Sequence, residues 1–509
     1  MNDTAANIQT LAIEIEGGRP ARRARALPVS DVDLPDANEA TPFAVAAGAT
    51  RAYAEFVVRT TLDDLPAEMM PRLRSLLLDM VGITAFAAGH VESSPAINAA
   101  VTRLDPDEGP ATAIGMARGF SWAYAALLNG AHAHSLDFDD TNIVQNGHPG
   151  APVISAALSD AERLDCDARS FFEALAVGYE VACRTGGAIG EGSWARGFHM
   201  TSVSGIFGAV AAIGKLRRFD AATLENAFGL ALSKAAGSMQ YLDNGAWNKR
   251  LHPGFAAHDA LVCATLAEAG VIGASKSLEG KYGLMTSYTG EAHPEILLDG
   301  LGETWIAMQT AVKPYPSCRL THGAIDATLK LRGKVPLAER DGARLAVELS
   351  PAGMRIVGGA TPEKTQPTNA VSAQFSVFFQ VAAAWQEGQV EWAVYDRVRT
   401  PELRAAARRV TATVNAGLPN NAANVTVTAG GKTLRETILV PLGEPGNWIG
   451  DAELRHKFML LAVPVYGEGR AVWLADAVLG LSPEQPMRGI AKMLRLQPGP
   501  SSSSRGDIQ

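Results

Sequence analysis

The sequence contains little cysteine and no long apolar run. Its four cysteines, Cys166, Cys183, Cys263 and Cys318, lie far apart and form no CxxC pair, which excludes a disulfide scaffold and a cysteine-based zinc site. No uninterrupted apolar stretch of about 18 residues occurs, so no membrane span is expected. The cysteine usage fits a reducing compartment, and we expect a cytoplasmic protein.

Charged residues are also few, and acidic residues slightly outnumber basic ones. The net charge is -8, and no basic stripe with interleaved aromatic residues is present, which argues against a nucleic-acid partner. Charged residues make up only 19% of the 509 residues and hydrophobic residues 47%. This composition excludes a disordered protein or a coiled coil and predicts a large packed core, divided into about two to four domains.

Both ends of the chain have the composition of disordered tails. Residues 1–43 combine an arginine-rich run with an acidic run and several prolines, and residues 496–509 include four consecutive serines. The N-terminal tail has no apolar region typical of a secretory signal. Its arginines leave a mitochondrial presequence as the alternative to a cytoplasmic location.

Helical periodicity dominates the first part of the chain. Apolar residues recur at helical spacing from Met69 to Val81. Further helices are expected at about 121–134, 170–183, 202–216, 221–238 and 256–270. Small residues such as Gly208 and Ala212 would let the helix backbones approach closely. We therefore predict a helical domain over 44–310.

The pattern changes near residue 310. Short alternating segments with β-branched residues, at 344–349, 408–414 and 424–427, predict strands, and 372–386 predicts a helix among them. Helical patterning returns at 452–461 and 473–479. The predicted fold is mainly α, with a large helical domain (44–310 and 441–495) and an inserted, smaller α+β lid domain (311–440).

The densest polar segment runs from His134 to Gly150 and contains Asp137, Asp139 and Asp140. These aspartates could bind a hard cation such as Mg²⁺, cap helices, or orient a catalytic histidine. Mg²⁺ binding in a helical protein would suggest an isoprenoid synthase. No second acidic motif faces this one, which disfavours that reading.

Three further segments combine ionisable residues with turn residues. His199 precedes a plausible helix N-cap, where free N–H groups favour a carboxylate. Lys249 and Lys313 lie in apparent loops at 245–254 and 313–322, and lysine is otherwise rare in this chain. Polar loops in an apolar chain are where binding residues tend to lie.

Taken in order, these segments resemble the MmgE/PrpD family over about residues 45–495. The matching segments are LNGAHAHSLDFDDT (128–141), RGFHMTSV (196–203), GAWNKRLHPG (245–254), LEGKYG (278–283) and KPYPSCRLTH (313–322). The resemblance implies a homodimer with an active site between the two domains that needs no metal or organic cofactor. It assigns six residues to that site: Asp137, Thr141, His148, His199, Lys249 and Lys313.

Two positions depart from the decarboxylases of this family. They have a histidine where this chain has Cys318, and a tyrosine on the lid helix where this chain has Phe379. The KPYPSC form is similar instead to a bacterial and fungal branch that includes an epimerase. The resemblance therefore leaves the reaction open.

The resemblance implies a lyase, a dehydratase or decarboxylase, acting on a small di- or tricarboxylate such as 2-methylcitrate or cis-aconitate. These reactions pass through a carbanion or enolate beside a carboxylate. His148 and His199 would transfer protons, Asp137 would orient a histidine and Thr141 would donate a hydrogen bond. Cationic and polar groups would bind the substrate carboxylates: Lys249, Lys313, Arg250, Arg319 and His322.

Two other functions remain open. An epimerase of a small dicarboxylate such as iminodisuccinate needs two proton-transfer groups on opposite faces of a carbon, and the thiol of Cys318 could be one. A catalytically inactive interaction protein could also keep the fold, although most polar residues of the motifs are retained.

Overall fold

The computed structural model describes residues 42–497, and the fold is mainly α-helical with two small sheets, consistent with the expected fold class. The tails expected at 1–43 and 496–509 lie almost entirely outside the described residues. No single helix within the described range is long and apolar enough to cross a membrane. Helices α2 and α3 would be apolar enough if joined, but the chain bends by 91° between them.

Between residues 42 and 310 the chain forms twelve α-helices. They are α1 (Ala49–Arg59), α2 (Met69–His90), α3 (Ser94–Leu104), α4 (Trp122–Ala133), α5 (Gly150–Leu164), α6 (Ala168–Ala195), α7 (Met200–Val203), α8 (Gly205–Leu216), α9 (Ala221–Leu232), α10 (Asn248–Glu268), α11 (Leu284–Tyr288) and α12 (Glu295–Leu298). Short 3-10 or π segments occur at 44–46, 62–64, 239–243, 306–309, 319–321, 337–339, 354–358 and 392–397.

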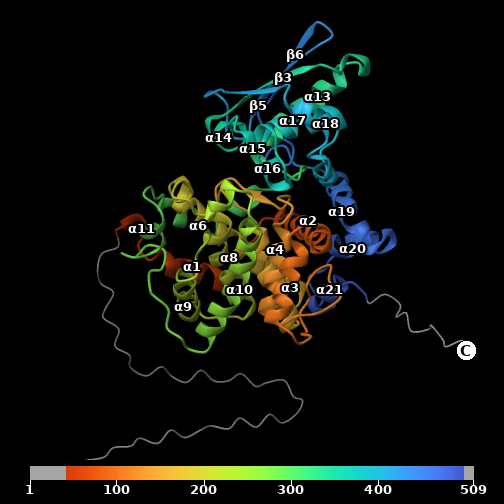
Figure 1. The fold of residues 1–509 in the computed structure, drawn as a ribbon. Coiled ribbons are helices and arrows are strands. Elements are labelled where there is room, and N and C mark those ends of the chain that lie inside the picture. Colours follow the sequence, from red (N-terminus) through yellow and green to blue (C-terminus); the bar gives the residue numbers. More distant parts are fainter. Residues whose placement is uncertain (1–41, 498–509) are drawn as a thin grey trace, which may run out of the picture. The chain divides into compact units, whose positions relative to one another are not determined.

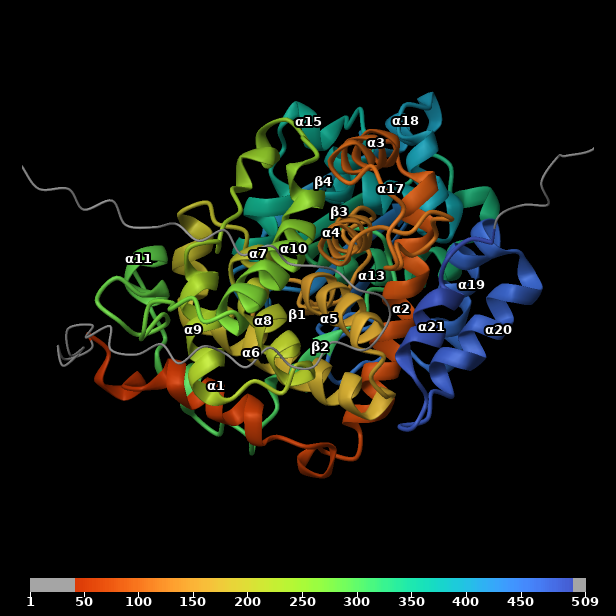
Figure 2. The same ribbon diagram turned by 90° about the horizontal axis from the view of Figure 1, so that it is seen from below.

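Helices α4, α5, α6, α8 and α10 pack side by side in the middle of this part (Figures 1 and 2). Helix α8 is almost entirely buried because it has no polar face. A Cβ atom at Gly208 would come within 2.4 Å of the Gly178 carbonyl, and one at Gly130 within 2.8 Å of Gly254. The predicted close approach of helices at small residues such as Gly208 is therefore confirmed. Gly208 brings α8 against α6, and Gly130 brings α4 against α10.

A four-stranded sheet follows, in the order β4-β3-β5-β6. Its strands are β3 (Arg344–Leu349), β4 (Val410–Val414), β5 (Ala423–Ala429) and β6 (Lys432–Ile438). Strand β3 pairs parallel to β4 and antiparallel to β5, and β5 pairs antiparallel to β6. Gly430 and Gly431, both with positive φ, form the turn of the β5–β6 hairpin.

Helices from the second half cover this sheet and form a core with its apolar residues. The helices are α13 (His322–Lys334), α14 (Pro351–Gly353), α15 (Pro362–Thr365), α16 (Ala370–Gln374), α17 (Val377–Glu387) and α18 (Pro401–Ala407). Leu345 and Val347 of β3 pack with Leu331 of α13 and Val381 of α17. The alternation that predicted β3 thus reflects one face buried beneath helices.

The chain then returns to the first helices. The last helices are α19 (Asp451–Tyr466), α20 (Glu468–Leu479) and α21 (Met487–Met493). Helices α19 and α20 pack against α2, and α21 packs against α5 (Figure 2). This return brings the C-terminal segment next to the loop that follows α4.

Two elements differ from the sequence expectations. The segment 245–254 was expected to be a loop, but α10 begins at Asn248 and includes Lys249 and Pro253. Proline removes the hydrogen bond to the carbonyl four residues earlier and crowds that carbonyl, a cost that the close packing of α10 against α4 offsets. Strand β6 was not expected, because its polar residues face solvent at a sheet edge.

Candidate active site

The site is built around the loop that joins α4 to α5. Within this loop, β1 (Thr141–Asn142) pairs with β2 (Thr310–Ala311), which brings it beside Lys313. Asp137 adopts a left-handed conformation with φ 50°. This conformation is uncommon for a residue other than glycine, so contacts from the surrounding structure must hold it.

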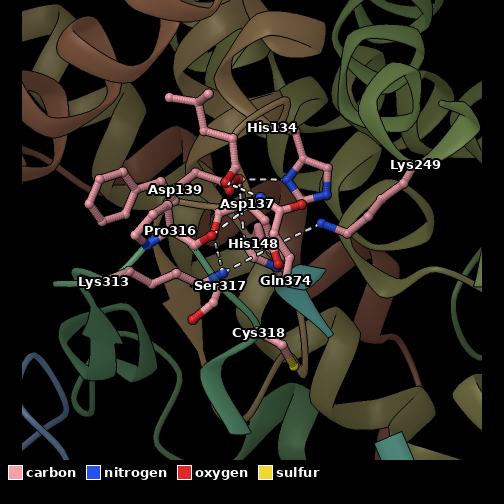
Figure 3. Close-up of polar contacts among 12 residues, drawn as sticks. His134, Asp137, Asp139, His148, Lys249, Lys313, Pro316, Ser317, Cys318 and Gln374 are labelled. Carbon is pink, nitrogen blue, oxygen red and sulfur yellow. Dashed lines mark hydrogen bonds and ion pairs between the residues drawn. The ribbon is translucent and has the colours of Figure 1, made fainter. Parts of the chain in front are cut away.

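Asp139 contacts two histidines (Figure 3). Its Oδ2 atom lies 2.7 Å from Nδ1 of His134 and 3.3 Å from Nδ1 of His148. A carboxylate only accepts hydrogen bonds, so His134 carries its proton on Nδ1. The same tautomer of His148 would leave Nε2 free to exchange a proton.

Burial keeps both imidazoles neutral. It lowers the pKa of His134 to about 3, and it also lowers the pKa of His148 although Asp139 opposes this effect. Burial alone would raise the pKa of Asp139, but the two histidines outweigh it and hold that pKa well below its ordinary range. Asp139 is therefore the ionised member of this group.

Asp137 joins two lysines from distant parts of the chain (Figure 3). Its Oδ1 atom accepts hydrogen bonds from Nζ of Lys249 at 2.8 Å and of Lys313 at 3.1 Å. Lys313 also donates to the Asp137 carbonyl at 2.8 Å. Burial favours the neutral carboxyl, but the two ammonium groups dominate and hold the pKa of Asp137 well below its ordinary range. Two lysines against one aspartate give this cluster a net positive charge.

His148 lies between the two carboxylates. Its Nε2 atom is 4.0 Å from Oδ1 of Asp137, and its backbone N–H donates to Oγ1 of Thr201. Its ring meets that of His134 edge to face, with centroids 4.6 Å apart. The imidazole is thus held from several sides while its side chain remains 13% exposed.

His199 belongs to a second histidine pair. Its Nδ1 atom lies 3.0 Å from Nδ1 of His252, so one ring donates and the other accepts. Burial lowers the pKa of His199 well below its ordinary range and that of His252 to about 4. The ring of His199 also lies 5.4 Å from that of His134, centroid to centroid.

A cavity of about 400 Å³ opens over these groups. Of the residues expected in the site, Asp137, Thr141, His148, His199, Lys249, Lys313, Cys318 and Arg319 line it. Burial raises the pKa of the Cys318 thiol to about 11, so the thiol is protonated at neutral pH. Apolar residues including Leu242, Ile296 and Ile356 line other parts of the wall.

The structure does not bring three of the expected substrate-binding groups to the cavity as free groups. Arg250 instead pairs with Glu92 at 2.8 Å and donates to Ser93. Arg319 lines the cavity, but its Nε and Nη2 atoms both donate to the carboxylate of Glu444. His322 is buried, with Nε2 3.2 Å from the carbonyl of Ser317. These side chains were predicted to bind substrate because of their place in the motifs. A motif does not indicate the direction in which each side chain points.

Phe379, the lid residue that departs from the decarboxylases, does not line the cavity. It is buried in a separate apolar cluster, where its ring stacks on Tyr395 with centroids 5.9 Å apart. The hydroxyl of Tyr395 donates to the carbonyl of Pro316 at 2.7 Å, just before Ser317 and Cys318.

Sequence reasoning missed several groups that support the site. His134 and His252 lie inside the quoted motifs, and their place in those motifs was the signal available. Gln374 donates to the carbonyl of Leu136 at 2.6 Å. Lys457, which follows Phe138 by 319 residues in the sequence, donates to the carbonyl of Phe138. No local pattern could have indicated these last two contacts.

His134, Asp139 and His148 could also hold a metal ion, since one ligand atom from each lies within 4.8 Å of the others. In the described structure, however, Asp139 uses the same oxygen to contact both rings. The same geometry fits a carboxylate that orients two imidazoles as well as it fits a metal site.

Comparisons with known proteins support the family that the motifs resemble. The chain is 28% identical over 466 residues to a cis-aconitate decarboxylase of Aspergillus terreus, covering 85% of this chain and 93% of that protein. A cis-aconitate decarboxylase-like protein of Aspergillus oryzae is also 28% identical, over 473 residues and 94% of its length. Human cis-aconitate decarboxylase is 31% identical over 224 residues, 43% of this chain and 46% of that protein. The MmgE/PrpD N-terminal domain model matches residues 51–297 and the C-terminal domain model residues 315–481, and the chain therefore belongs to the MmgE/PrpD family.

Proposed function

We propose that this protein is a cofactor-independent lyase that decarboxylates a small tricarboxylate of the cis-aconitate type. The observation that carries the proposal is the convergence of Lys249, Lys313 and His148 on one cavity beside two ionised aspartates. Lys249 and Lys313 share one carboxylate oxygen of Asp137, so both ammonium groups keep N–H donors for the carboxylates of a polyanionic substrate. The names of the similar fungal and human proteins support decarboxylation as the reaction.

The ammonium groups of Lys249 and Lys313 would bind substrate carboxylates and stabilise negative charge as it develops. In a cis-aconitate-type substrate, the bond between the allylic CH₂ and its carboxylate breaks and CO₂ leaves. The electron pair shifts through the double bond to the far carbon, which becomes an enolate beside a second carboxylate. One proton delivered to that carbon completes the product.

His148 is the proposed proton donor. Burial lowers its pKa in the free protein, but a bound polyanion would raise that pKa again, since opposite charge stabilises the imidazolium. Asp139 beside Nδ1 would orient the ring and leave Nε2 for transfer to carbon. Substrate binding would therefore load the proton that the reaction consumes.

One observation favours epimerisation as a second candidate. The protonated thiol of Cys318 lines the same cavity as the neutral imidazole of His148. A base on one side and an acid on the other is the arrangement that inversion at a carbon beside a carboxylate needs. A small polycarboxylate of the iminodisuccinate type would be the substrate.

The proposal is tested by NMR of the purified protein with cis-aconitate, 2-methylcitrate, citrate and iminodisuccinate, each in D₂O. Decarboxylation predicts loss of CO₂ from cis-aconitate and a product with deuterium on one carbon. Exchange or inversion at the α carbon of iminodisuccinate, with cis-aconitate unchanged, would support the epimerase. Loss of water from 2-methylcitrate or citrate alone would indicate a dehydratase and contradict both candidates. No change in any acid would contradict an enzymatic role.

A further inference from the structure

Lys457 is a buried cation behind the site, on α19. Its Nζ atom forms an ion pair with Asp79 of α2 at 2.6 Å and donates to the carbonyls of Phe138 and Lys313, each at 2.9 Å. The ammonium group therefore donates to two carbonyls, and its charge is balanced by the Asp79 carboxylate. The ammonium also lies 3.7 Å from the centre of the Phe138 ring.

The two carbonyls belong to the backbone segments that carry the proposed substrate-binding and orienting groups. Phe138 lies between Asp137 and Asp139, and the second carbonyl is that of Lys313 itself. Lys313 donates in turn to the carbonyl and carboxylate of Asp137. Lys457 therefore joins the backbones on both sides of the Asp137–Lys313 contact.

Asp137 needs such support because of its left-handed backbone, with φ 50°. Without Lys457, the carbonyl of the next residue would lose its buried donor, and the loop could relax to a more common conformation. Relaxation would turn the Asp137 carboxylate away from Lys249 and shift Asp139 relative to His148. A displacement of about 1 Å at a site of this kind can cost about a hundredfold in rate.

Burying this cation is costly. Burial lowers the pKa of Lys457 and raises that of Asp79, although each opposes the shift of the other. A buried ion pair can often be replaced by apolar residues without loss of stability. An apolar pair would fill the same space but could not donate to two carbonyls.

We propose that Lys457 is a positioning residue that fixes the 134–142 loop against the Lys313 segment and so aligns Asp137 and Asp139. Its consequence for turnover rests on the proposed function, whereas its effect on the loop does not. Asp79 anchors the ammonium in place.

The test compares Lys457→Met, the double variant Asp79→Leu/Lys457→Met, and the control Lys334→Met. Lys334 is an exposed lysine that pairs with Glu436 at 2.8 Å, so its removal eliminates a lysine ion pair away from the site. Each variant is examined by thermal melting, by hydrogen exchange with mass spectrometry, and by steady-state kinetics on the acid that the wild type converts.

The single variant leaves Asp79 buried without its partner, so a lower melting temperature is expected. In the double variant the apolar pair should restore most of the melting temperature. We expect amide exchange in peptides covering 134–142 and 310–316 to rise at least about tenfold in the double variant, with α6 and α8 unchanged. We expect kcat to fall about a hundredfold, with a smaller change in KM, and Lys334→Met to behave as wild type.

A double variant with restored stability, wild-type exchange in both peptides and wild-type kcat would overturn the proposal, because Lys457 would then serve only the ion pair. If the double variant does not regain the melting temperature of the wild type, amide hydrogen exchange of the same two peptides is measured in Lys457→Arg. Arginine can keep both carbonyl contacts, so preserved protection there supports positioning, and protection lost equally in arginine and methionine variants contradicts it. If the wild type converts no acid, the proposed function fails, while hydrogen exchange still tests the role of Lys457.

Discussion

Replacing Lys249 by methionine should weaken substrate binding more than it slows the reaction. Among the described residues, its ammonium donates one hydrogen bond, to Asp137, so two N–H groups remain for a ligand in the cavity. A charge-assisted contact contributes about 1.5–3 kcal/mol, which corresponds to a rise in KM of about 10- to 150-fold. Asp137 would still pair with Lys313, so no buried carboxylate is left without a partner.

Lys313→Met should behave differently. Lys313 donates two hydrogen bonds within the protein, one to the carboxylate of Asp137 and one to its backbone carbonyl. Its side chain is only 2% exposed. Its loss leaves a buried carbonyl without that donor, at a cost of about 1–3 kcal/mol in the free energy of unfolding. We therefore expect kcat, KM and stability all to change.

The assay is steady-state kinetics on the converted acid, with chemical denaturation of each variant and Lys334→Met as the matched control. The comparison of kcat with KM separates binding common to ground and transition states from stabilisation of the transition state alone. Wild-type KM in Lys249→Met would remove Lys249 from the substrate site. A Lys313→Met variant with wild-type stability would contradict the role assigned to its contacts with the loop.

Three other outcomes follow from the geometry. Activity should survive EDTA, because Asp139 orients two histidines and is not expected to bind a metal ion. Complete loss of activity in EDTA that Mg²⁺ restores would contradict this. If His148 must be protonated, kcat/KM should already be falling as pH rises toward 6.5, since burial lowers the pKa of this imidazole below that value; a fall toward acid pH instead would assign it the role of a base. Burial lowers the pKa of His132 to about 4 from an ordinary 6.5, so its contribution to stability is present above pH 6.5 and lost as pH falls toward 4. His132→Asn should reduce the slope of unfolding free energy by up to about 1.4 kcal/mol per pH unit in that interval, as measured by denaturation at several pH values, and an unchanged slope would refute the buried neutral state.

The sequence indicated the fold class well because periodicity reports burial directly. The segment 344–349 alternates, and it forms β3 over those same residues with one face under α13 and α17. The beginning of α10 could not be predicted in this way. Pro253 and Gly254 are typical of a turn, yet close contact between Gly254 and Gly130 stabilises the helix there.

The residue types of the candidate site were predictable, and their partners were not. The motifs bring His148, Lys249 and Lys313 to one cavity. Both lysines were expected to bind substrate carboxylates, and in the structure each also donates to the Asp137 carboxylate. Arg250 follows Lys249 directly in a helix and therefore points elsewhere, toward Glu92. Such directions depend on tertiary contacts that a motif does not encode.

The most direct test of the central claim, proton transfer by His148 to the decarboxylated substrate, is ¹H NMR of wild type and His148→Gln with cis-aconitate in D₂O. Glutamine keeps a hydrogen-bonding group but cannot exchange a proton. We predict that the wild type releases CO₂ and forms a product with one deuterium on carbon. The variant should keep a nearly unchanged melting temperature while kcat falls by about 10²- to 10⁴-fold. A folded His148→Gln variant that forms the deuterated product at the wild-type rate would contradict the account.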